Sequence, residues 1–414
     1  MWYIAKHSHR EYPNGSYTIT YDDLKRMYEE NLLRKQECKQ VTESSYRGES
    51  YYKNDGRPGN KKAPDFMQAF FQEILYRDPK TSGLIREYPH GIVISQGERG
   101  SAYRGERQIY TRSTTTLSRS LEKFETEKDK RLYRIVAEMR IAEFRFFLRN
   151  FDRVACWEEK GLSVLWEPLA QHYGLETDWL DITNDFNTAI FFATCRWDNG
   201  SRRWLPLTKE QTERNEDTRY GVLFHAPAEN VMLDNMSCAY KAWRNNNYEG
   251  IILPIGYQPF MRCHSQYGYG LYMKEPAPLQ GNPTFEELHF LHSEKLSEAV
   301  YELMDCGRKI YPQEGIGKFR DIIDSISIAT SFSEDAFQQV LQANGWTDQA
   351  DKFRLDLSQF KICGVPISIS GDSHPFRVSR QRIRSANRKD RNFSIEKEYG
   401  IQLLYRKMLY ELEN

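Results

Sequence analysis

The polar segment at residues 101–119 (SAYRGERQIYTRSTTTLSR) follows the apolar run Ile92-Val93-Ile94. It places Arg104 directly before Gly105, and a stretch rich in hydroxyl groups then leads to Arg119. The planar guanidinium of arginine suits phosphate oxygens, and glycine lets a ligand come close to the backbone. The segment is therefore a candidate phosphate site. An ion pair of Arg104 with a nearby carboxylate and a simple turn at Gly105 would give the same pattern.

A second cluster occupies residues 166–194, where Gln171, His172 and Tyr173 end a helical pattern at a glycine, a residue that favours helix termination. Asp181 then precedes a helical pattern that is apolar almost all round, and such a helix must be buried. Polar groups just ahead of it are expected at the edge of the core, where pockets form. His172 and Asp181 could also be only a helix cap and a satisfied buried pair.

A third cluster, residues 259–276, places Arg262, His264 and Gln266 ahead of a Tyr-Gly-Tyr-Gly sequence and a short strand pattern. Like the other two clusters, this one is dense in polar and special-geometry residues. The alternative interpretation is a glycine-rich entry into a strand, with no ligand involved.

Hydrophobic periodicity predicts the elements that must position these clusters. Helices are expected at residues 22–37, after Pro64, and over the long pattern of residues 122–149. Strands are expected at 221–226, 250–255 and 270–273, and helices again at 294–308, 316–329 and 333–343. The chain then continues with alternating Val365, Ile367 and Ile369, a basic run at 376–391, and an amphipathic helix at about 394–412.

This order predicts an α+β fold, in which short strands pack against helices and helical extensions lie at both ends. We expect an N-terminal helical segment at residues 1–94, a central domain at 95–315, and a mostly helical C-terminal segment at 316–414 that carries the basic run.

Composition and absent motifs exclude several classes of protein. The 58 basic and 58 acidic side chains cancel, so no global field favours nucleic acid or an anionic membrane. The apolar runs are too short to span a bilayer and the start lacks a signal-peptide pattern, which predicts a cytoplasmic protein without membrane contact. Seven cysteines spread singly argue against a disulfide framework or a zinc site, and Cys195 is expected in the core. The sequence lacks the P-loop, HExxH, GxSxG and EF-hand motifs, and we expect no metal.

Taken in order, the three clusters resemble the FRG-domain family over roughly residues 95–315. The family opens with an aromatic-Arg-Gly motif and a stretch ending in arginine, continues with a helix glutamate and a signature of the form QHYGLPTRLLDWT, and closes with an RxxxQxGxF-like segment and a short helix before a proline. The similar segments here are Tyr103-Arg104-Gly105 to Arg119, Glu138 or Glu143, Gln171 to Ala193, Arg262 to Leu271, and Leu303 to Pro312. The chain departs from the signature at Glu176 and at Asp178, which replaces an arginine. If that arginine binds an anion in relatives, this protein has lost the contact or supplies it from elsewhere.

The layout of an early arginine, a His-Tyr pair and a late carboxylate or glutamine also resembles ADP-ribosyltransferase-like enzymes, and the likeness would extend to their fold. The resemblance implies NAD as the cofactor, cleaved or used for ADP-ribosyl transfer, and bacterial conflict or phage defence as the setting. It implies cofactor binding by Arg104, Gly105, Arg119, Gln171, Arg262 and Gln266, and catalytic roles for His172, Tyr173, Asp181 and Glu138. His172 and Tyr173 would bind the ribose or stack on nicotinamide, and Asp181, Glu106 or Glu138 would stabilise positive charge.

Two alternatives remain open at this stage. The same pocket could belong to a non-catalytic module that senses a nucleotide or a protein partner. The basic run, FRVSRQRIRSANRKDR, holds seven basic residues and one acid, and such a run can neutralise the phosphates of RNA or DNA. A nucleic acid or a protein could equally be the acceptor of a transferred group. A solvated basic face is the other interpretation of the run.

Overall fold

The structure of the chain is a computed structural model. It describes residues 16–45, 84–88, 91–95, 101–159, 164–231, 234, 252–255, 258–273, 277–371 and 375–390. The helix predicted after Pro64 and the closing helix at about 394–412 lie outside the described residues.

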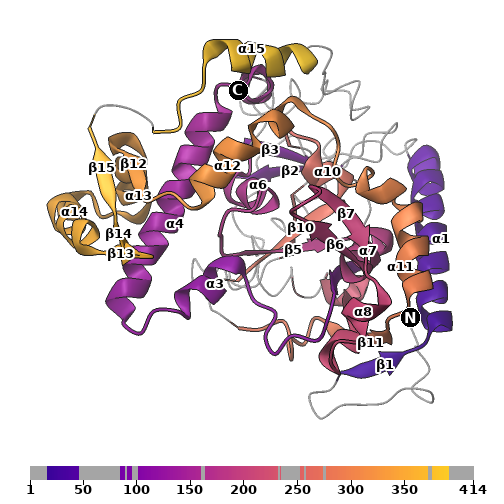
Figure 1. The fold of residues 1–414 in the computed structure, drawn as a ribbon. Helices are drawn as coiled ribbons and strands as arrows, with labels where there is room; N and C mark the ends of the chain where they lie inside the picture. The colour runs from indigo at the N-terminus through magenta and orange to yellow at the C-terminus, as the bar shows by residue number, and fades with distance from the viewer. Residues whose placement is uncertain are drawn as a thin grey trace, which may run out of the picture.

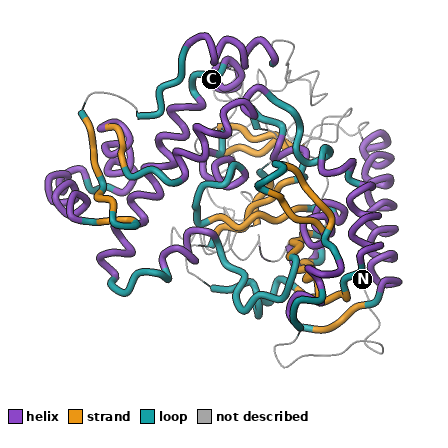
Figure 2. Tube along the Cα trace, in the orientation of Figure 1, coloured by secondary structure: helices purple, strands orange, loops and turns teal. Residues whose placement is uncertain are grey.

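A seven-stranded mixed sheet forms the centre of the molecule (Figures 1 and 2). Its order is β1-β11-β8-β4-β5-β10-β9, and every neighbouring pair is antiparallel except β1 and β11. The strands are β1 (Tyr17–Ile19), β11 (Glu286–Leu291), β8 (Tyr220–Ala226), β4 (Ala102–Glu106), β5 (Trp179–Thr183), β10 (Gly268–Tyr272) and β9 (Ile252–Pro254). The predicted strands at 221–226, 250–255 and 270–273 are confirmed, and the α+β class with them.

One face of this sheet is covered by helix α7 (Phe186–Thr194), which packs against β4 and β8. Almost all of its residues are buried, as its uninterrupted apolar sequence predicts. Behind it lie α1 (Tyr21–Ser45) and α11 (Glu294–Leu303), side by side in Figure 1. Cys195 is fully buried in this core, as expected.

Helix α4 (Glu127–Leu148) joins the sheet-bearing part to a lobe built from the C-terminal segment (Figure 1). Thr126 caps its first turn by accepting a hydrogen bond from the backbone of Asp129, so the helix begins five residues later than predicted. The lobe contains α12 (Arg320–Ser327), α13 (Glu334–Asn344), η6 (Thr347–Gln349), α14 (Ala350–Gln359), β12 (Ser331–Ser333), β13 (Lys361–Ile362), β14 (Val365–Pro366) and β15 (Ser368–Ser370).

Shorter elements complete the described chain. They are the hairpin β2 (Leu84–Tyr88) and β3 (Gly91–Ser95), α3 (Thr116–Leu121), α5 (Asp152–Glu159), α6 (Trp166–His172), the hairpin β6 (Cys195–Asp198) and β7 (Arg203–Pro206), α8 (Lys209–Thr212), η3 (Asp217–Arg219), α10 (Arg262–Ser265), η4 (Asp305–Gly307), η5 (Gly315–Phe319) and α15 (Arg380–Lys389). The helix predicted at 294–308 ends earlier, at Leu303, because residues 305–307 all have positive φ.

Candidate functional site

A cavity of about 740 Å³ opens beside β4 and β5, and residues of all three sequence clusters line it. Its wall carries six arginines and two carboxylates, which gives it a strongly positive interior. They are Arg104, Arg107, Arg112, Arg119, Arg262 and Arg320, with Glu106 and Asp181. Arginine donors of this density suit phosphate or another multiply charged anion.

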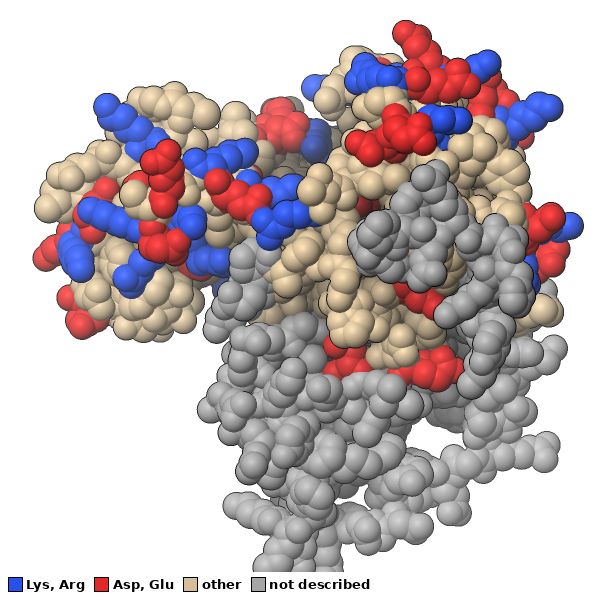
Figure 3. Space-filling view, turned by 90° about the horizontal axis from the view of Figure 1, so that it is seen from below, with Lys and Arg blue, Asp and Glu red and all other residues tan. Residues whose placement is uncertain are grey.

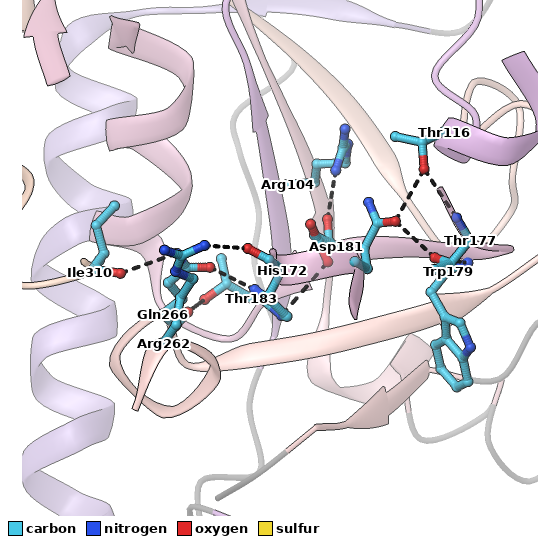
Figure 4. Close-up of polar contacts among 11 residues, drawn as sticks. Arg104, Thr116, His172, Thr177, Trp179, Asp181, Thr183, Arg262, Gln266 and Ile310 are labelled. Carbon is cyan, nitrogen blue, oxygen red and sulfur yellow. Dashed lines mark hydrogen bonds and ion pairs between the residues drawn. The ribbon is translucent and has the colours of Figure 1, made fainter. Parts of the chain in front are cut away.

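The cavity lies where β4 and β5 separate, since the two strands pair only through Tyr103 and Thr183. Beyond that pair Arg104 spans the gap: its Nη1 donates to the backbone oxygen of Asp181 at 2.7 Å (Figure 4), and its Nε donates to Glu106 Oε1 at 2.8 Å. Glu106 also accepts a 2.6 Å hydrogen bond from the hydroxyl of Ser113. The alternative foreseen for Arg104, an ion pair with a neighbouring acid, is therefore present, and the arginine still faces the cavity.

Gly105 lines the cavity, and the packing of β4 against α7 requires a glycine at this position. A Cβ atom at this position would sit 1.8 Å from the backbone oxygen of Ala189 in α7. The absence of a side chain lets β4 lie directly against the helix, which fixes Arg104 on the neighbouring position of the strand.

The second and third clusters meet at His172, the last residue of α6. Its Nδ1 lies 2.9 Å from Gln266 Oε1, and its Nε2 faces Asp181 Oδ1 at 3.7 Å (Figure 4). Gln266 is buried, and its Nε2 donates to the backbone oxygen of Ile310 at 3.1 Å. Both ends of the Gln266 amide thus contact protein, so this residue holds His172, and its expected contact with a cofactor stays a prediction.

Arg262 lies between two aromatic rings, with its guanidinium carbon 4.2 Å from the centroid of Tyr173 and 4.7 Å from that of Tyr311. Its Nη1 also donates to the backbone oxygen of His172 at 2.7 Å. Burial raises the pKa of the Tyr173 hydroxyl, and the ring is only 3% exposed. The ring of Tyr173 therefore packs against the guanidinium of Arg262 and does not offer the open stacking face predicted for it.

Gln171 and Arg119 complete the polar wall. The Oε1 atom of Gln171 accepts hydrogen bonds from the hydroxyls of Thr177 at 2.8 Å and Thr116 at 3.1 Å, which leaves its Nε2 as the donor end. Arg119 donates to the backbone oxygen of Thr114. Burial, with the neighbouring charge of Arg104 as the next cause, lowers the pKa of Arg119. The positive charges of Arg104 and Arg119 repel each other, so an anion bound between them would be stabilised by both.

An aromatic group at one end of the cavity was not foreseen from sequence. Trp197, Trp204 and Tyr311 line it together, and the rings of Trp197 and Tyr311 are inclined by only 24° with centroids 6.1 Å apart. The side chain of Trp197 remains 42% exposed. The sequence shows only that two tryptophans, Trp197 and Trp204, lie near each other in the chain. Their pairing across the β6–β7 hairpin is seen only in the fold.

Glu138 does not reach the cavity, and its predicted catalytic role lacks the necessary geometry. It projects from another face of α4 and accepts a 2.7 Å hydrogen bond from Asn344 in the C-terminal lobe. Burial raises the pKa of Glu138 to about 7. Glu143, the other glutamate of the family resemblance, accepts from the backbone of Ser333 at 2.6 Å and is also a structural residue.

The two departures from the family signature are used for contacts outside the cavity. Asp178 pairs with Arg134 of α4, and burial raises the pKa of its carboxyl despite that arginine. Glu176 accepts from the hydroxyls of Ser120 at 2.6 Å and Tyr133 at 2.7 Å. Both residues thus tether this segment to α3 and α4, while Arg107, Arg112 and Arg320 bring positive charge to the cavity from other segments.

The basic run is partly engaged within the fold. Helix α15 packs against η5, and Arg382 pairs with Asp321 at 2.5 Å and donates to the backbone of Lys318 at 2.6 Å. On the face seen in Figure 3, basic and acidic side chains alternate over the lobe that carries α13 and α14. The nucleic-acid interpretation of the basic run stays a prediction.

Within the part of the chain that the structure describes, no cluster of three or more His, Cys, Asp or Glu residues is arranged to hold a metal ion. The helices of that same part include none with the length and apolarity needed to cross a membrane.

Comparison with known families gives one match: residues 99–201 fit the model of the FRG domain. The match includes the first two clusters, from Arg104 to Asp181, and ends before the third, which the fold brings to the same cavity. Searches of curated proteins and of solved structures return no match to the chain.

Proposed function

With the FRG domain at residues 99–201 as the premise, we propose that the cavity binds an anionic nucleotide and that this nucleotide is NAD, cleaved between nicotinamide and ribose. The single observation that carries the proposal is the combination of six arginines with the exposed carboxylate of Asp181 in one cavity. The volume of about 740 Å³ lies within the range that small-molecule ligands occupy.

The arginines provide for the pyrophosphate. Arg104 and Arg119 are close enough for their charges to interact, and Arg104 is fixed by both Glu106 and the backbone of Asp181. Guanidinium groups that are already oriented lose little freedom when they bind phosphate oxygens. The Nε2 donor of Gln171 adds a neutral contact nearby.

Asp181 is the carboxylate best suited to the ribose. Cleavage of the nicotinamide–ribose bond passes through an oxocarbenium-like transition state, which a nearby carboxylate stabilises. The Asp181 side chain is 38% exposed, whereas that of Glu106 is 6% exposed and bound to Arg104 and Ser113. We assign charge stabilisation to Asp181 for this reason and give Glu106 the role of holding Arg104.

A planar ring of the ligand would stack at the aromatic end of the cavity. The exposed ring of Trp197, backed by Tyr311, offers a stacking face for nicotinamide or adenine. Stacking is assigned to Trp197 because the ring of Tyr173 is covered by Arg262.

Release of nicotinamide from NAD, followed by chromatography, tests this proposal. The purified protein is incubated with NAD alone and with cell extract as a source of protein or nucleic-acid acceptors, beside Arg104→Ala and the remote surface variant Lys352→Gln. We expect release by the wild type and by Lys352→Gln, and loss of release in Arg104→Ala. Release that survives in Arg104→Ala contradicts the assignment. Calorimetric binding of NAD without any release would instead indicate a module that senses the nucleotide.

A further inference from the structure

The hydrogen bonds around Gln266 determine which nitrogen of His172 carries a proton. The backbone oxygen of Ile310 can only accept, so the Gln266 atom that contacts it at 3.1 Å is the Nε2 donor. The Oε1 atom of the same amide then points to His172 Nδ1 at 2.9 Å and must accept a hydrogen bond from it. His172 is therefore protonated at Nδ1, and in the neutral imidazole Nε2 is the basic nitrogen.

This arrangement is built in from several sides. The backbone oxygen of Gln266 accepts a 2.7 Å hydrogen bond from the hydroxyl of Thr183, which ties the glutamine to the end of β5. Gly268 leaves space for the imidazole, since a Cβ at that position would lie 3.1 Å from His172 Nε2. The ring is thereby held with its Nε2 toward Asp181.

Among the residues that the structure describes, Nε2 of His172 has no hydrogen-bond partner; it is buried and faces Asp181 Oδ1 at 3.7 Å. A nitrogen lone pair directed at a carboxylate oxygen repels it, and burial of an unpaired polar atom costs free energy. One proton placed between the two atoms removes both penalties, because it converts the repulsion into a hydrogen bond or an ion pair.

We propose that Asp181 and His172 hold one proton in common and together form the proton-accepting group of the cavity, with Gln266 as the residue that positions His172. Asp181 is the member that meets a ligand, because its side chain is 38% exposed whereas that of His172 is 2% exposed. His172 is buried and contacts the carboxylate of Asp181, so it affects a ligand only through Asp181.

The chemical consequence rests on the proposed cleavage of NAD. When the hydroxyl of an acceptor, or water, forms a bond to the ribose C1′, the bond from C1′ to the nicotinamide nitrogen breaks and its electron pair leaves with neutral nicotinamide. The attacking oxygen loses one proton in this step. In molecules whose pair does not yet carry the shared proton, Asp181 takes the proton released in this step and His172 Nε2 then shares it. The carboxylate therefore remains charged beside the oxocarbenium-like centre for longer.

Positive charge from several elements surrounds the pair. Arg104 from β4, Arg262 from α10 and Arg320 from α12 line the same cavity and oppose the addition of positive charge. Two further titratable neighbours stay neutral, because burial raises the pKa values of the Cys263 thiol and of the Tyr311 hydroxyl.

Nitrogen-15 NMR of the His172 imidazole in the ligand-free protein tests the inference, with the resonance assigned by its absence in His172→Gln. We expect the Nδ1-protonated form in the wild type, and a second proton that binds at least tenfold more weakly in Asp181→Asn, because a facing carboxylate changes a proton equilibrium by this order. The remote variant Asp348→Asn removes an equal charge from the C-terminal lobe and should leave the titration unchanged. In Gln266→Met, the two neutral tautomers should become mixed.

A wild-type imidazole that carries its single proton on Nε2 overturns the inference, and so does an Asp181→Asn protein that titrates like the wild type. Asp181→Asn is isosteric, so it decides the matter even if Gln266→Met does not fold. Because the measurement uses no NAD, a protein that titrates as expected but releases no nicotinamide would refute the proposed function and leave the proton-sharing pair standing.

Discussion

Gly105 of β4 approaches the backbone of Ala189 in α7 so closely that a methyl group at position 105 would lie 1.8 Å from the Ala189 oxygen. The cavity depends on this contact, since it sets the distance between the strand that carries Arg104 and the helix beneath it.

Gly105→Ala should therefore destabilise the protein. Insertion of a methyl group into a closely packed core typically costs about 1–3 kcal/mol. The atoms that this methyl group would meet belong to the backbone of α7, which can move less than a side chain can. Denaturant unfolding measures the change, with Gly317→Ala as the control, because no heavy atom lies within 4 Å of a Cβ at position 317. Equal stability of the two variants would show that β4 and α7 are not packed as described.

Removal of one partner from the buried Arg153–Glu314 ion pair should be strongly destabilising. The atoms are 2.8 Å apart and the side chains are 5% and 6% exposed. Glu314 also accepts from the backbone of Met261, next to α10. Arg153→Met would leave the carboxylate buried without its cation, at a cost of about 3–5 kcal/mol.

The exposed pair of Arg308 and Asp305 provides the matched control for that variant. Arg308→Met should change the free energy of unfolding far less, because solvent screens both charges. An Arg153→Met protein as stable as Arg308→Met would contradict the buried pair.

Glu138 should make the stability of the protein depend on pH. Burial raises the pKa of Glu138 to about 7, so between roughly pH 4.5 and 7 the folded state binds more protons at this position than the unfolded state. The contribution of this residue to stability is then present at low pH and is lost as the pH rises through 7. Glu138→Gln removes the titration and should gain roughly 2 kcal/mol relative to the wild type between pH 5 and pH 8.

Urea unfolding of both proteins at the two pH values checks this expectation. Glu125→Gln, which changes an exposed acid in the loop before α4, should follow the wild type. A difference between Glu138→Gln and the wild type that is the same at pH 5 and pH 8 would mean that the carboxyl is not buried as described.

The strand order, which the sequence does not reveal, brings the three clusters together, because each lies on or just ahead of one of three neighbouring strands. Arg104 is on β4, His172 ends α6 ahead of β5, and Arg262 begins α10 ahead of β10. β4, β5 and β10 are neighbours in the sheet, so polar residues near their ends converge on one opening. The family resemblance includes all three clusters, whereas the match to the family model covers only the first two.

Roles that depend on the direction of a single side chain could not be predicted. Glu138 accepts a hydrogen bond from Asn344 of the C-terminal lobe, and a helical pattern alone does not say which neighbour each face of α4 meets. Gln266 and Tyr173 have residue types that bind ligands, but contacts with Ile310 and Arg262 already engage them. The strand β1 has only three residues and pairs in parallel with a distant segment, so no local alternation reveals it.

Calorimetric titration of NAD tests the central claim, that the arginine-lined cavity binds an anionic nucleotide, most directly. We predict saturable binding to the wild type and to Lys352→Gln, and affinity at least tenfold weaker in Arg104→Gln, because this change removes the guanidinium that spans β4 and β5. The thermal midpoint of each protein shows whether the variants are folded. Undiminished binding to folded Arg104→Gln, or the absence of binding to the wild type, would contradict the claim.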